Sequence, residues 1–374
     1  MVIIGISAIA PAYIDRMSQG GGHAPAENAA RRGAVAATDT LTRAVRWLRW
    51  GKGSGSPAAR PLVDLEVIMS SAPLPGAVPA VRLPALPASV RLGVGGGGLA
   101  VARVTSRTGA AEIYLRGAHV TAWAPANSDP VIWMSSQTRF TPESPLRGGV
   151  PLCFPWFGAN AADPAAPSHG FARLAQWELT AAREDGDDVV VTFRLSDTAE
   201  THASVWPHRF EAEYTVTVGA RLTLSLRVAN HDAETVSFEE AFHTYLGVRD
   251  IRSTEISGLE GVPFLDKVDA FAVKHGEDRP VGFSGETDRI YYDTTGTTAV
   301  IDAGRTITVV KQNSSSAVVW NPWAEKAAAM TDFGNDEWGG MVCLETANLG
   351  RNAVSIAPGE RHTMTATYAV GFAE

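Results

Sequence analysis

The sequence contains a histidine and a glutamate whose surroundings suit general acid–base catalysis, His243 and Glu345. Glu345 directly follows the apolar run MVCL. A carboxyl group at the end of a buried strand is costly unless it is paired or functional, and burial raises its pKa towards that of a base working near neutral pH. His243 lies in the strand-like stretch FHTYL, where alternation puts His243 and Tyr245 on the same face.

Both residues also have a structural interpretation. Glu345 could belong to a buried ion pair, and His243 could be a core histidine that is hydrogen-bonded for stability. In the catalytic interpretation, the preceding carboxylates Glu239 and Glu240 could hold the imidazole and make it a general acid. The residue types alone leave these alternatives open.

A third candidate is Arg147, in the segment LRGGVPLCFPWFG at 146–158. The glycines after it permit unusual backbone angles and close approach of a ligand, while Pro151 and Pro155 stiffen the loop. Because a guanidinium can bind phosphate through paired N–H groups, this loop suits a sugar that carries an anionic group. The alternative is a structural turn with a surface arginine.

Two further segments add polar side chains. SHGFARLAQW at 168–177 contains His169 and Arg173, and SGETDRIYYD at 284–293 brings Asp288 next to an arginine and two tyrosines. The alternatives are a hydrogen-bonded structural histidine in the first segment and an ordinary charged loop in the second. The sequence has no serine-hydrolase elbow, zinc-protease motif, P-loop or dinucleotide fingerprint, so no single strong motif assigns a reaction.

Composition excludes several kinds of partner. The chain has 374 residues and a formal net charge of −8. Residues 1–68 carry eight basic and five acidic side chains, so the remainder has a net charge of −11 and suits neither nucleic acid nor an anionic membrane surface. No run approaches the ~20 apolar residues of a membrane span. An anionic substrate would therefore be bound by a few placed arginines.

Cysteine usage and the start of the chain bear on the compartment. Cys153 and Cys343 are too few for a disulfide framework or a cysteine-rich zinc site, which favours a reducing compartment. The apolar start has no basic residue before it, unlike a signal peptide. We therefore expect a cytoplasmic protein.

The elements that must position these residues are β-strands. Alternating apolar and polar residues occur at 189–195, 210–218 and 221–230, and a two-residue gap of hairpin length separates the last two stretches. Long amphipathic helices are absent from this part of the sequence. The pattern predicts an all-β sandwich or barrel.

The chain divides into three parts on composition. Residues 1–68 mix glycine-, alanine- and arginine-containing stretches and are expected to be a disordered extension, or a segment upstream of a true start at Met69. Residues 69–97 are rich in proline and glycine, which predicts an extended lead-in. Residues 85–374 are expected to form the β domain.

Five segments, in the order RGGVPLCFPWFG, HGFARLAQW, FHTYL, GETDRIY and CLETAN, resemble the glucose-6-phosphate 1-epimerase branch of the aldose 1-epimerase family. The resemblance covers roughly residues 85–374. It implies a large antiparallel β-sandwich of the galactose mutarotase-like kind, with the sugar on its concave face. It also implies action on a hexose 6-phosphate. We expect a monomer, and an acid–base reaction of this kind needs no metal or redox cofactor.

The resemblance also implies roles for individual residues. His243 resembles the family's general acid and Glu345 its general base. Arg147 resembles a contact to the substrate phosphate, and Asp288 resembles a residue that holds sugar hydroxyls. Two more residues are implied to line the same pocket, His169 and Arg173.

One position departs from the family pattern. Many relatives have a lysine shortly before RGG, where this chain has Ser144-Pro145-Leu146. Part of the phosphate contact is therefore unassigned, and Gln137 or Arg139 could supply it.

The implied reaction is mutarotation. Glu345 would remove the C1 hydroxyl proton while His243 protonates the ring oxygen, and the open aldehyde would close again as the other anomer. Two other functions stay open: an epimerase of free hexoses, disfavoured by Arg147 and Arg173, and a non-catalytic sugar-phosphate binding module, disfavoured by the acid–base pair. A glycoside hydrolase would need two carboxylates flanking the bond.

Overall fold

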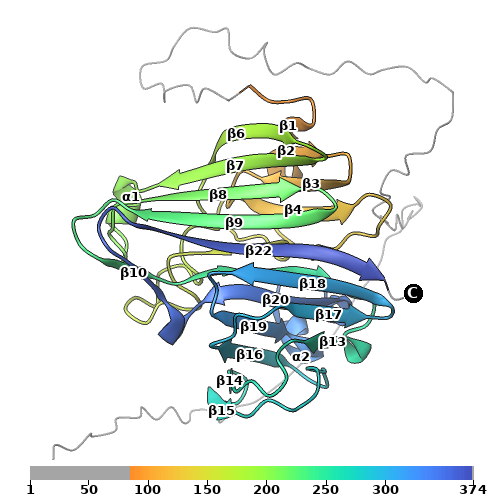
Figure 1. Ribbon diagram of the computed structural model, residues 1–374. Helices are drawn as coiled ribbons and strands as arrows, with labels where there is room; N and C mark the ends of the chain where they lie inside the picture. Colours follow the sequence, from red (N-terminus) through yellow and green to blue (C-terminus); the bar gives the residue numbers. More distant parts are fainter. Residues whose placement is uncertain (1–84, 373–374) are drawn as a thin grey trace, which may run out of the picture. The chain divides into compact units, whose positions relative to one another are not determined.

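The structure of the protein, a computed structural model, describes residues 85–372 (Figure 1). The predictions for residues 1–68, and for the lead-in up to residue 84, lie outside the described residues. The last part of the expected lead-in contains a strand, β1 (Val90–Val94), followed by the 3-10 turn η2 (Gly96–Gly98). Among the described residues, the first strand therefore lies at the end of the expected lead-in.

One layer of the molecule, in front in Figure 1, is an eight-stranded antiparallel sheet. In spatial order its strands are β13 (Glu255–Ser257), β17 (Thr298–Asp302), β18 (Arg305–Gln312), β22 (Arg361–Phe372), β9 (Arg221–Asn230), β8 (Phe210–Val218), β7 (Asp188–Ser196) and β6 (Glu178–Asp185). Along β8, Phe210, Ala212 and Tyr214 are buried while the residues between them are partly exposed. This alternation gives the sheet one apolar face.

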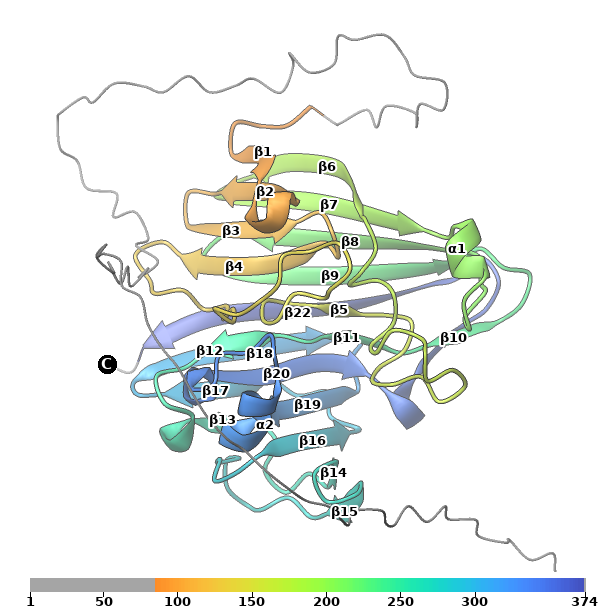
Figure 2. The same cartoon turned by 180° about the vertical axis from the view of Figure 1, so that it is seen from behind.

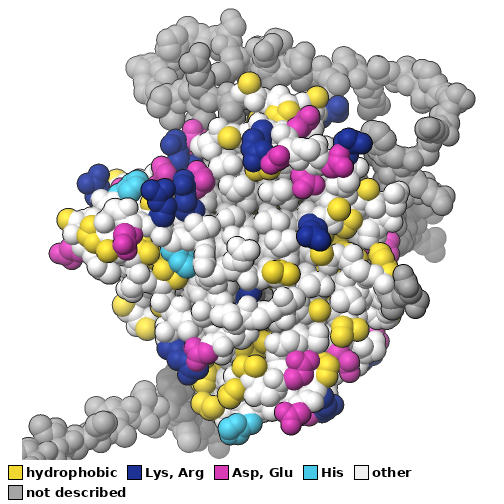
Figure 3. Space-filling view, viewed as in Figure 1, with side chains coloured by type: hydrophobic (Ala, Val, Ile, Leu, Met, Phe, Trp, Pro, Cys, Tyr) yellow, Lys and Arg dark blue, Asp and Glu magenta, His cyan; other side chains and the backbone are white. Residues whose placement is uncertain are grey.

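The outer face of this sheet is polar and mostly uncharged. Hydroxyl groups form cross-strand hydrogen bonds there, between Thr223 and Thr367 (3.0 Å) and between Ser225 and Thr365 (3.2 Å). Figure 3 shows this face as a broad area with few hydrophobic or charged side chains, which gather mainly towards its margins. The apolar side chains of these strands therefore point inward.

The second layer, in front in Figure 2, contains two sheets. The four-stranded antiparallel sheet is β1, β2 (Ala100–Thr105), β3 (Gly109–Tyr114) and β4 (His119–Pro125). The eight-stranded sheet runs in the order β15 (Ala272–Lys274), β14 (Phe264–Asp266), β16 (Thr287–Tyr292), β19 (Ser316–Asn321), β20 (Met341–Asn348), β11 (Glu240–Phe242) and β5 (Leu152–Cys153), with β12 (Tyr245–Gly247) also paired to β20.

The remaining elements are short. They are the strand pair β10 (Val236–Phe238) and β21 (Val354–Ile356), the helices α1 (Ala199–His202) and α2 (Trp323–Ala329), and the 3-10 turns η3 (Ile251–Ser253), η4 (Glu337–Gly340) and η5 (Gly350–Asn352). In the part of the chain that the structure describes, no helix has the length and apolar character that crossing a membrane requires.

The apolar core lies between the two layers. A buried hydrogen bond of 2.7 Å between Thr244 Oγ1 and Tyr368 Oη also joins them. In β20, Val342 and Leu344 belong to this core, so alternation turns Cys343 and Glu345 to the opposite, outer face of the second layer. The fold therefore presents these two side chains away from the core between the sheets.

The prediction of an all-β antiparallel sandwich is confirmed. The stretches predicted as strands at 189–195, 210–218 and 221–230 correspond to β7, β8 and β9, and β8 and β9 form the expected hairpin. The structure also confirms the alternation after β11, because Phe242 is in the core and Thr244 bonds across it, while His243 and Tyr245 face a cavity on the other side.

Candidate active site

Four neighbouring chain segments form the floor of the candidate site. Asp288 of β16 pairs in register with Trp320 of β19, and Trp320 pairs with Cys343 of β20. Cys343 in turn pairs with Tyr245 of β12. Because paired residues point to the same side of a sheet, their side chains form one row across its outer face.

A cavity of about 210 Å³ opens on this face. Its lining contains five of the six residues predicted for the site, together with residues that the sequence did not single out. The lining residues are Arg147, Phe157, His169, His243, Tyr245, Lys267, Asp288, Val318, Trp320, Lys326, Met330 and Glu345. The sixth predicted residue, Arg173, is not among them.

His243 and Glu345 lie side by side in this cavity. The distance from His243 Nδ1 to Glu345 Oε1 is 3.4 Å, and the two residues are only 9% and 2% exposed. Neither His243 Nδ1 nor Glu345 Oε2 has a hydrogen-bond partner among the described residues. The His243 ring stacks on that of Tyr245, with 5.0 Å between the ring centres. The pair is therefore held by packing and left open for another proton donor or acceptor.

Burial shifts the two groups in opposite directions. It raises the pKa of Glu345 well above its ordinary value, and the nearby carboxylate of Asp288 adds to this effect. Burial lowers the pKa of His243 well below its ordinary value, and the charges nearby, including those of Arg173 and Arg147, lower it further. The carboxyl group of Glu345 therefore holds its proton more strongly, and the imidazole of His243 less strongly, than in water.

The expectation that Glu239 and Glu240 hold His243 is wrong. Glu239 accepts hydrogen bonds from the backbone N–H groups of Phe157 (2.8 Å) and Gly350 (2.7 Å). Glu240 lies 2.9 Å from His362 in a fully buried position. Glu240 shares the core-facing side of its strand with Phe242, which points away from the cavity.

His169 is held in a defined orientation by its loop. It has a positive φ of 63°, and Gly170 follows with a φ of 74°, where a Cβ would lie 2.0 Å from the carbonyl oxygen of Phe154. The backbone N–H of Gly158 donates to His169 Nδ1 (3.2 Å), which assigns the proton of the neutral ring to Nε2. Burial, helped by the charge of Arg173, lowers the pKa of His169 to about 3. His169 is therefore a neutral ring with an N–H donor.

Arg147 is anchored by two neighbours. Its Nε and Nη2 lie 3.2 Å and 3.1 Å from Asp332 Oδ2, and its Nη1 donates to the hydroxyl of Tyr245 (3.2 Å). Burial opposes the charged form of Arg147, but Tyr245 and Asp332 outweigh it and raise its pKa. The guanidinium is thus fixed and charged, and it keeps further N–H groups for a ligand.

Arg173 supports the site from outside its lining. Its Nη2 donates to the carbonyl oxygen of Ser168 (2.6 Å), and its buried Nε has no hydrogen-bond partner among the described residues. No carboxylate in residues 85–372 forms an ion pair with it. The geometry therefore gives Arg173 an electrostatic influence on His169 and His243, but no direct place in the cavity wall.

Two lysines in the lining were missed by the sequence analysis. Lys267 follows β14 and lies 2.9 Å from Asp288 Oδ2, while Lys326 of α2 lies 2.5 Å from Glu286 Oε1. Gln137 and Arg139, which were considered as substitutes for the missing family lysine, are exposed and do not line the cavity. No local pattern marks Lys267 or Lys326, because only the pairing of distant strands brings them to this face.

The site also contains donor atoms for a metal ion. One ligand atom each from His243, Cys343 and Glu345 lie within 4.8 Å of one another, and all three residues are buried. The second cysteine, Cys153, has its sulfur 3.4 Å from His169 Nδ1, and burial raises the pKa of its thiol above the usual range. Both thiols are protonated near neutral pH unless a cation binds them.

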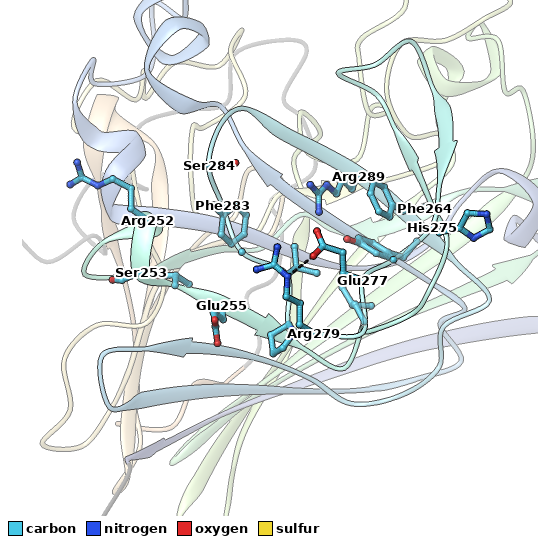
Figure 4. A pocket seen from close by; sticks show the side chains of 17 residues that line it. Arg252, Ser253, Glu255, Phe264, His275, Glu277, Arg279, Phe283, Ser284 and Arg289 are labelled. Atoms are coloured by element: carbon cyan, nitrogen blue, oxygen red, sulfur yellow. Dashed lines mark hydrogen bonds and ion pairs between the residues drawn. The ribbon is translucent and has the colours of Figure 1, made fainter.

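A larger cavity, of about 380 Å³, lies behind the same strand and is drawn in Figure 4. Arg289 and Tyr291 of β16 point into it, alternating with Asp288, which faces the candidate site. Figure 4 also shows the ion pair between Glu277 and Arg279 in its wall. None of the predicted site residues lines this cavity, whereas five of them line the smaller one.

Comparison with known proteins gives a consistent result. The family model described as aldose 1-epimerase matches residues 102–369. A protein from Cenchrus ciliaris named "Putative glucose-6-phosphate 1-epimerase" is 34% identical over 270 residues, which cover 68% of this chain and 79% of that protein.

Solved structures that share this fold include the following two. A crystal structure from Salmonella typhimurium titled "putative mutarotase" matches with a TM-score of 0.69 and 33% identity, covering 73% of this chain and 91% of that one. A galactose mutarotase-like protein from Clostridium acetobutylicum matches with a TM-score of 0.61 and covers 76% of this chain and 98% of that one. At 14% identity, the second match supports the fold alone.

Proposed function

The chain belongs to the aldose 1-epimerase family of isomerases, and we propose that it interconverts the α and β anomers of a hexose 6-phosphate. The observation that carries this proposal is the pair formed by His243 and Glu345, 3.4 Å apart in a cavity that is also lined by Arg147, Lys267 and Lys326. An acid, a base and a set of cations in one cavity match the two requirements of the reaction, proton transfer and binding of a phosphate.

In the proposed mechanism, the carboxylate of Glu345 removes the proton of the C1 hydroxyl while the imidazolium of His243 donates a proton to the ring oxygen O5. The C1–O5 bond breaks and the free aldehyde forms, leaving a protonated Glu345 and a neutral His243. Rotation about C1–C2 exposes the other face of the carbonyl, and the reverse transfers close the ring. The proton count of the pair is the same before and after the reaction.

The shifted proton affinities support this exchange of roles. Burial makes the carboxylate of Glu345 a stronger base and the imidazolium of His243 a stronger acid than in water. Acid–base catalysis is most effective when the pKa of the catalytic group lies near the operating pH, and each positioned group typically contributes ~10²–10⁴-fold. Neutral His169, with Nε2–H as a donor, can hold a sugar oxygen without competing for the transferred proton.

The phosphate would be bound by cations that the fold collects from distant segments. Arg147 is oriented by Asp332 and Tyr245 and keeps free N–H groups, and Lys326 is only partly buried at the cavity. We propose that Lys326 and Lys267 supply the contact that other family members make with a lysine before RGG. Asp288, 2.9 Å from Lys267, would hold sugar hydroxyls.

One observation favours a second candidate, an epimerase of free hexoses. Each cation in the lining already has a carboxylate partner: Asp332 for Arg147, Asp288 for Lys267 and Glu286 for Lys326. A cavity whose charges are balanced within the protein has less need of an anionic ligand. The two candidates therefore differ in substrate and share the acid–base pair.

Anomer exchange measured by NMR decides between the candidates. We expect acceleration of glucose 6-phosphate exchange well above that of glucose at equal concentrations, and a loss of about 10²–10⁴-fold of both rates in a correctly folded Glu345→Gln variant. Equal acceleration of both sugars would favour the free-hexose epimerase. Binding of the sugar phosphate without any accelerated exchange would overturn the catalytic assignment and favour a binding module.

A further inference from the structure

A cluster of three side chains in the candidate site combines ligand types that divalent transition metals prefer. His243, Cys343 and Glu345 offer an imidazole nitrogen, a sulfur and a carboxylate oxygen within 4.8 Å of one another. In residues 85–372 this is the one such group of three or more side chains. The proposed mutarotation uses His243 and Glu345 but has no use for Cys343.

The register of the sheet places the thiol directly beneath the acid–base pair. Cys343 and Glu345 are two residues apart on β20, so their side chains leave the strand on the same face. Cys343 is fully buried, whereas His243 and Glu345 also line the cavity. A cation entering the cavity would therefore meet the nitrogen and the oxygen first and the sulfur behind them.

Two atoms of the cluster lack partners. His243 Nδ1 and Glu345 Oε2 are buried without a hydrogen bond to any described residue. Buried polar atoms in a folded protein are nearly always satisfied, so two unpartnered atoms on neighbouring side chains of one cavity favour a ligand there. With His243 as a neutral imidazole, its Nδ1 and the carboxylate oxygen of Glu345 can both offer lone pairs, so a metal cation is a ligand that satisfies both atoms.

We infer that His243, Cys343 and Glu345 form a binding site for a thiophilic divalent cation of the Zn²⁺ type, and that the bound ion blocks the acid–base pair. Zinc bonds of about 2.0–2.3 Å require ligand atoms roughly 3.3–3.8 Å apart. The separation of His243 Nδ1 and Glu345 Oε1, 3.4 Å, already fits this requirement. The remaining separations, at most 4.8 Å, need only small side-chain rotations.

The chemistry of binding balances without any redox step. The Cys343 thiol loses its proton to solvent as the sulfur bonds to the cation, and Glu345 loses its proton in the same way if it carries one. Three protein ligands leave a fourth position of a tetrahedral ion open towards the cavity. Mg²⁺ would bind poorly to these three ligands because it prefers oxygen donors and octahedral geometry.

Metal binding can be tested without reference to catalysis. The metal-free protein is titrated with Co²⁺, whose bond to a thiolate gives a near-ultraviolet charge-transfer absorption. The chain has only two cysteines, so the band can come only from Cys153 or Cys343. We expect one equivalent of Co²⁺ to produce the band, Zn²⁺ to displace it, Cys343→Ser to abolish it and the control Cys153→Ser to retain it.

Inhibition is the part of the inference that rests on the proposed function. We expect Zn²⁺ to inhibit glucose 6-phosphate anomer exchange, a chelator to restore it, and Mg²⁺ to have no effect. Cys343→Ser should raise the Zn²⁺ concentration needed for half inhibition at least ~10–100-fold, since even changes outside the ligand shell cost this much affinity. Cys153→Ser should leave that concentration unchanged.

The outcomes separate the two proposals. A Co²⁺ band without any exchange activity would keep the metal site and overturn the proposed function. Activity without a band, or a band that survives Cys343→Ser, would overturn the metal site. If Cys343→Ser fails to fold, Cys343→Ala and the band of Cys153→Ser provide the same decision, because loss of the band in Cys153→Ser would overturn the site at Cys343.

Discussion

His243 Nδ1 lies 3.4 Å from Glu345 Oε1 because β11 and β20 pair antiparallel with Phe242 opposite Thr346. In this register His243, the residue after Phe242, lies opposite Glu345, the residue before Thr346. A slip of one residue in the pairing would turn Glu345 into the core between the sheets and separate the two groups. The strand pairing therefore determines the acid–base geometry.

Glu345→Gln should remove the proposed base while keeping the size of the side chain. We expect the exchange rate of glucose 6-phosphate to fall by about 10²–10⁴-fold, the range that a positioned acid or base contributes. KM should change little, because the amide still fills the same space. Circular dichroism and thermal unfolding check that the fold is retained, and an undiminished rate would rule out Glu345 as the base.

Lys326→Ala should weaken binding of the substrate phosphate and leave the proton-transfer steps unchanged. We expect kcat/KM for glucose 6-phosphate to fall roughly 10- to 100-fold, since a hydrogen bond to a charged group is worth about 1.5–3 kcal/mol. The smaller rate with glucose should stay the same. Arg139→Ala is the matched control, because Arg139 is exposed and outside the cavity lining. Equal losses with both sugars would contradict a phosphate contact.

Stability should fall as the solution is acidified, partly because of His119. Burial lowers the pKa of His119 from 6.5 to about 4. Between these pH values the unfolded chain binds a proton at this ring and the folded chain does not, so the free energy of unfolding decreases as pH falls. The loss from this residue is at most roughly 3 kcal/mol.

Urea unfolding at a series of pH values measures this effect. His119→Gln keeps a side-chain donor near the carbonyl oxygen of Gly148, which lies 2.8 Å from His119 Nε2, and should flatten the pH dependence. The control His275→Gln, at an exposed position, should not. A pH dependence that is the same in all three proteins would show that His119 does not cause it.

Gly170→Ala should destabilise the loop that carries His169. A Cβ at this position would lie 2.0 Å from the carbonyl oxygen of Phe154, and φ is +74°. Gly186→Ala is a matched control, because its φ is +63° but nothing lies within 4 Å of the added Cβ. The control should cost only the ~1–2 kcal/mol of the backbone conformation.

Thermal unfolding of the two glycine variants separates backbone strain from the clash. We expect a clearly larger loss of Tm for Gly170→Ala than for Gly186→Ala, together with weaker substrate binding because His169 is displaced. Similar losses in the two variants would mean that the loop at Gly170 can relax around the added methyl group.

Several strands of the fold can be predicted from local sequence patterns. Period-two alternation in segments such as 210–218 and 221–230 predicts half-buried strands, and a two-residue gap predicts their hairpin. His243 and Glu345 were candidates on local signals, a histidine in a strand-like stretch and a glutamate after an apolar run. Those signals left a structural role open, and the family resemblance favoured the catalytic one. Strands and hairpins depend on residues that are close in the sequence, so short-range patterns predict them.

The partners of the predicted residues, and two lysines of the lining, were decided by tertiary structure. Asp332 lies 185 residues from Arg147 in the sequence, and no local pattern near either residue predicts their contact. Lys267 and Lys326 likewise look like ordinary surface lysines, while Glu239 and Glu240 looked like partners of His243 and are not. Strand register and sheet order determine which side chains come into contact. Both depend on pairing between distant segments, and such pairing produces no periodic pattern in the sequence.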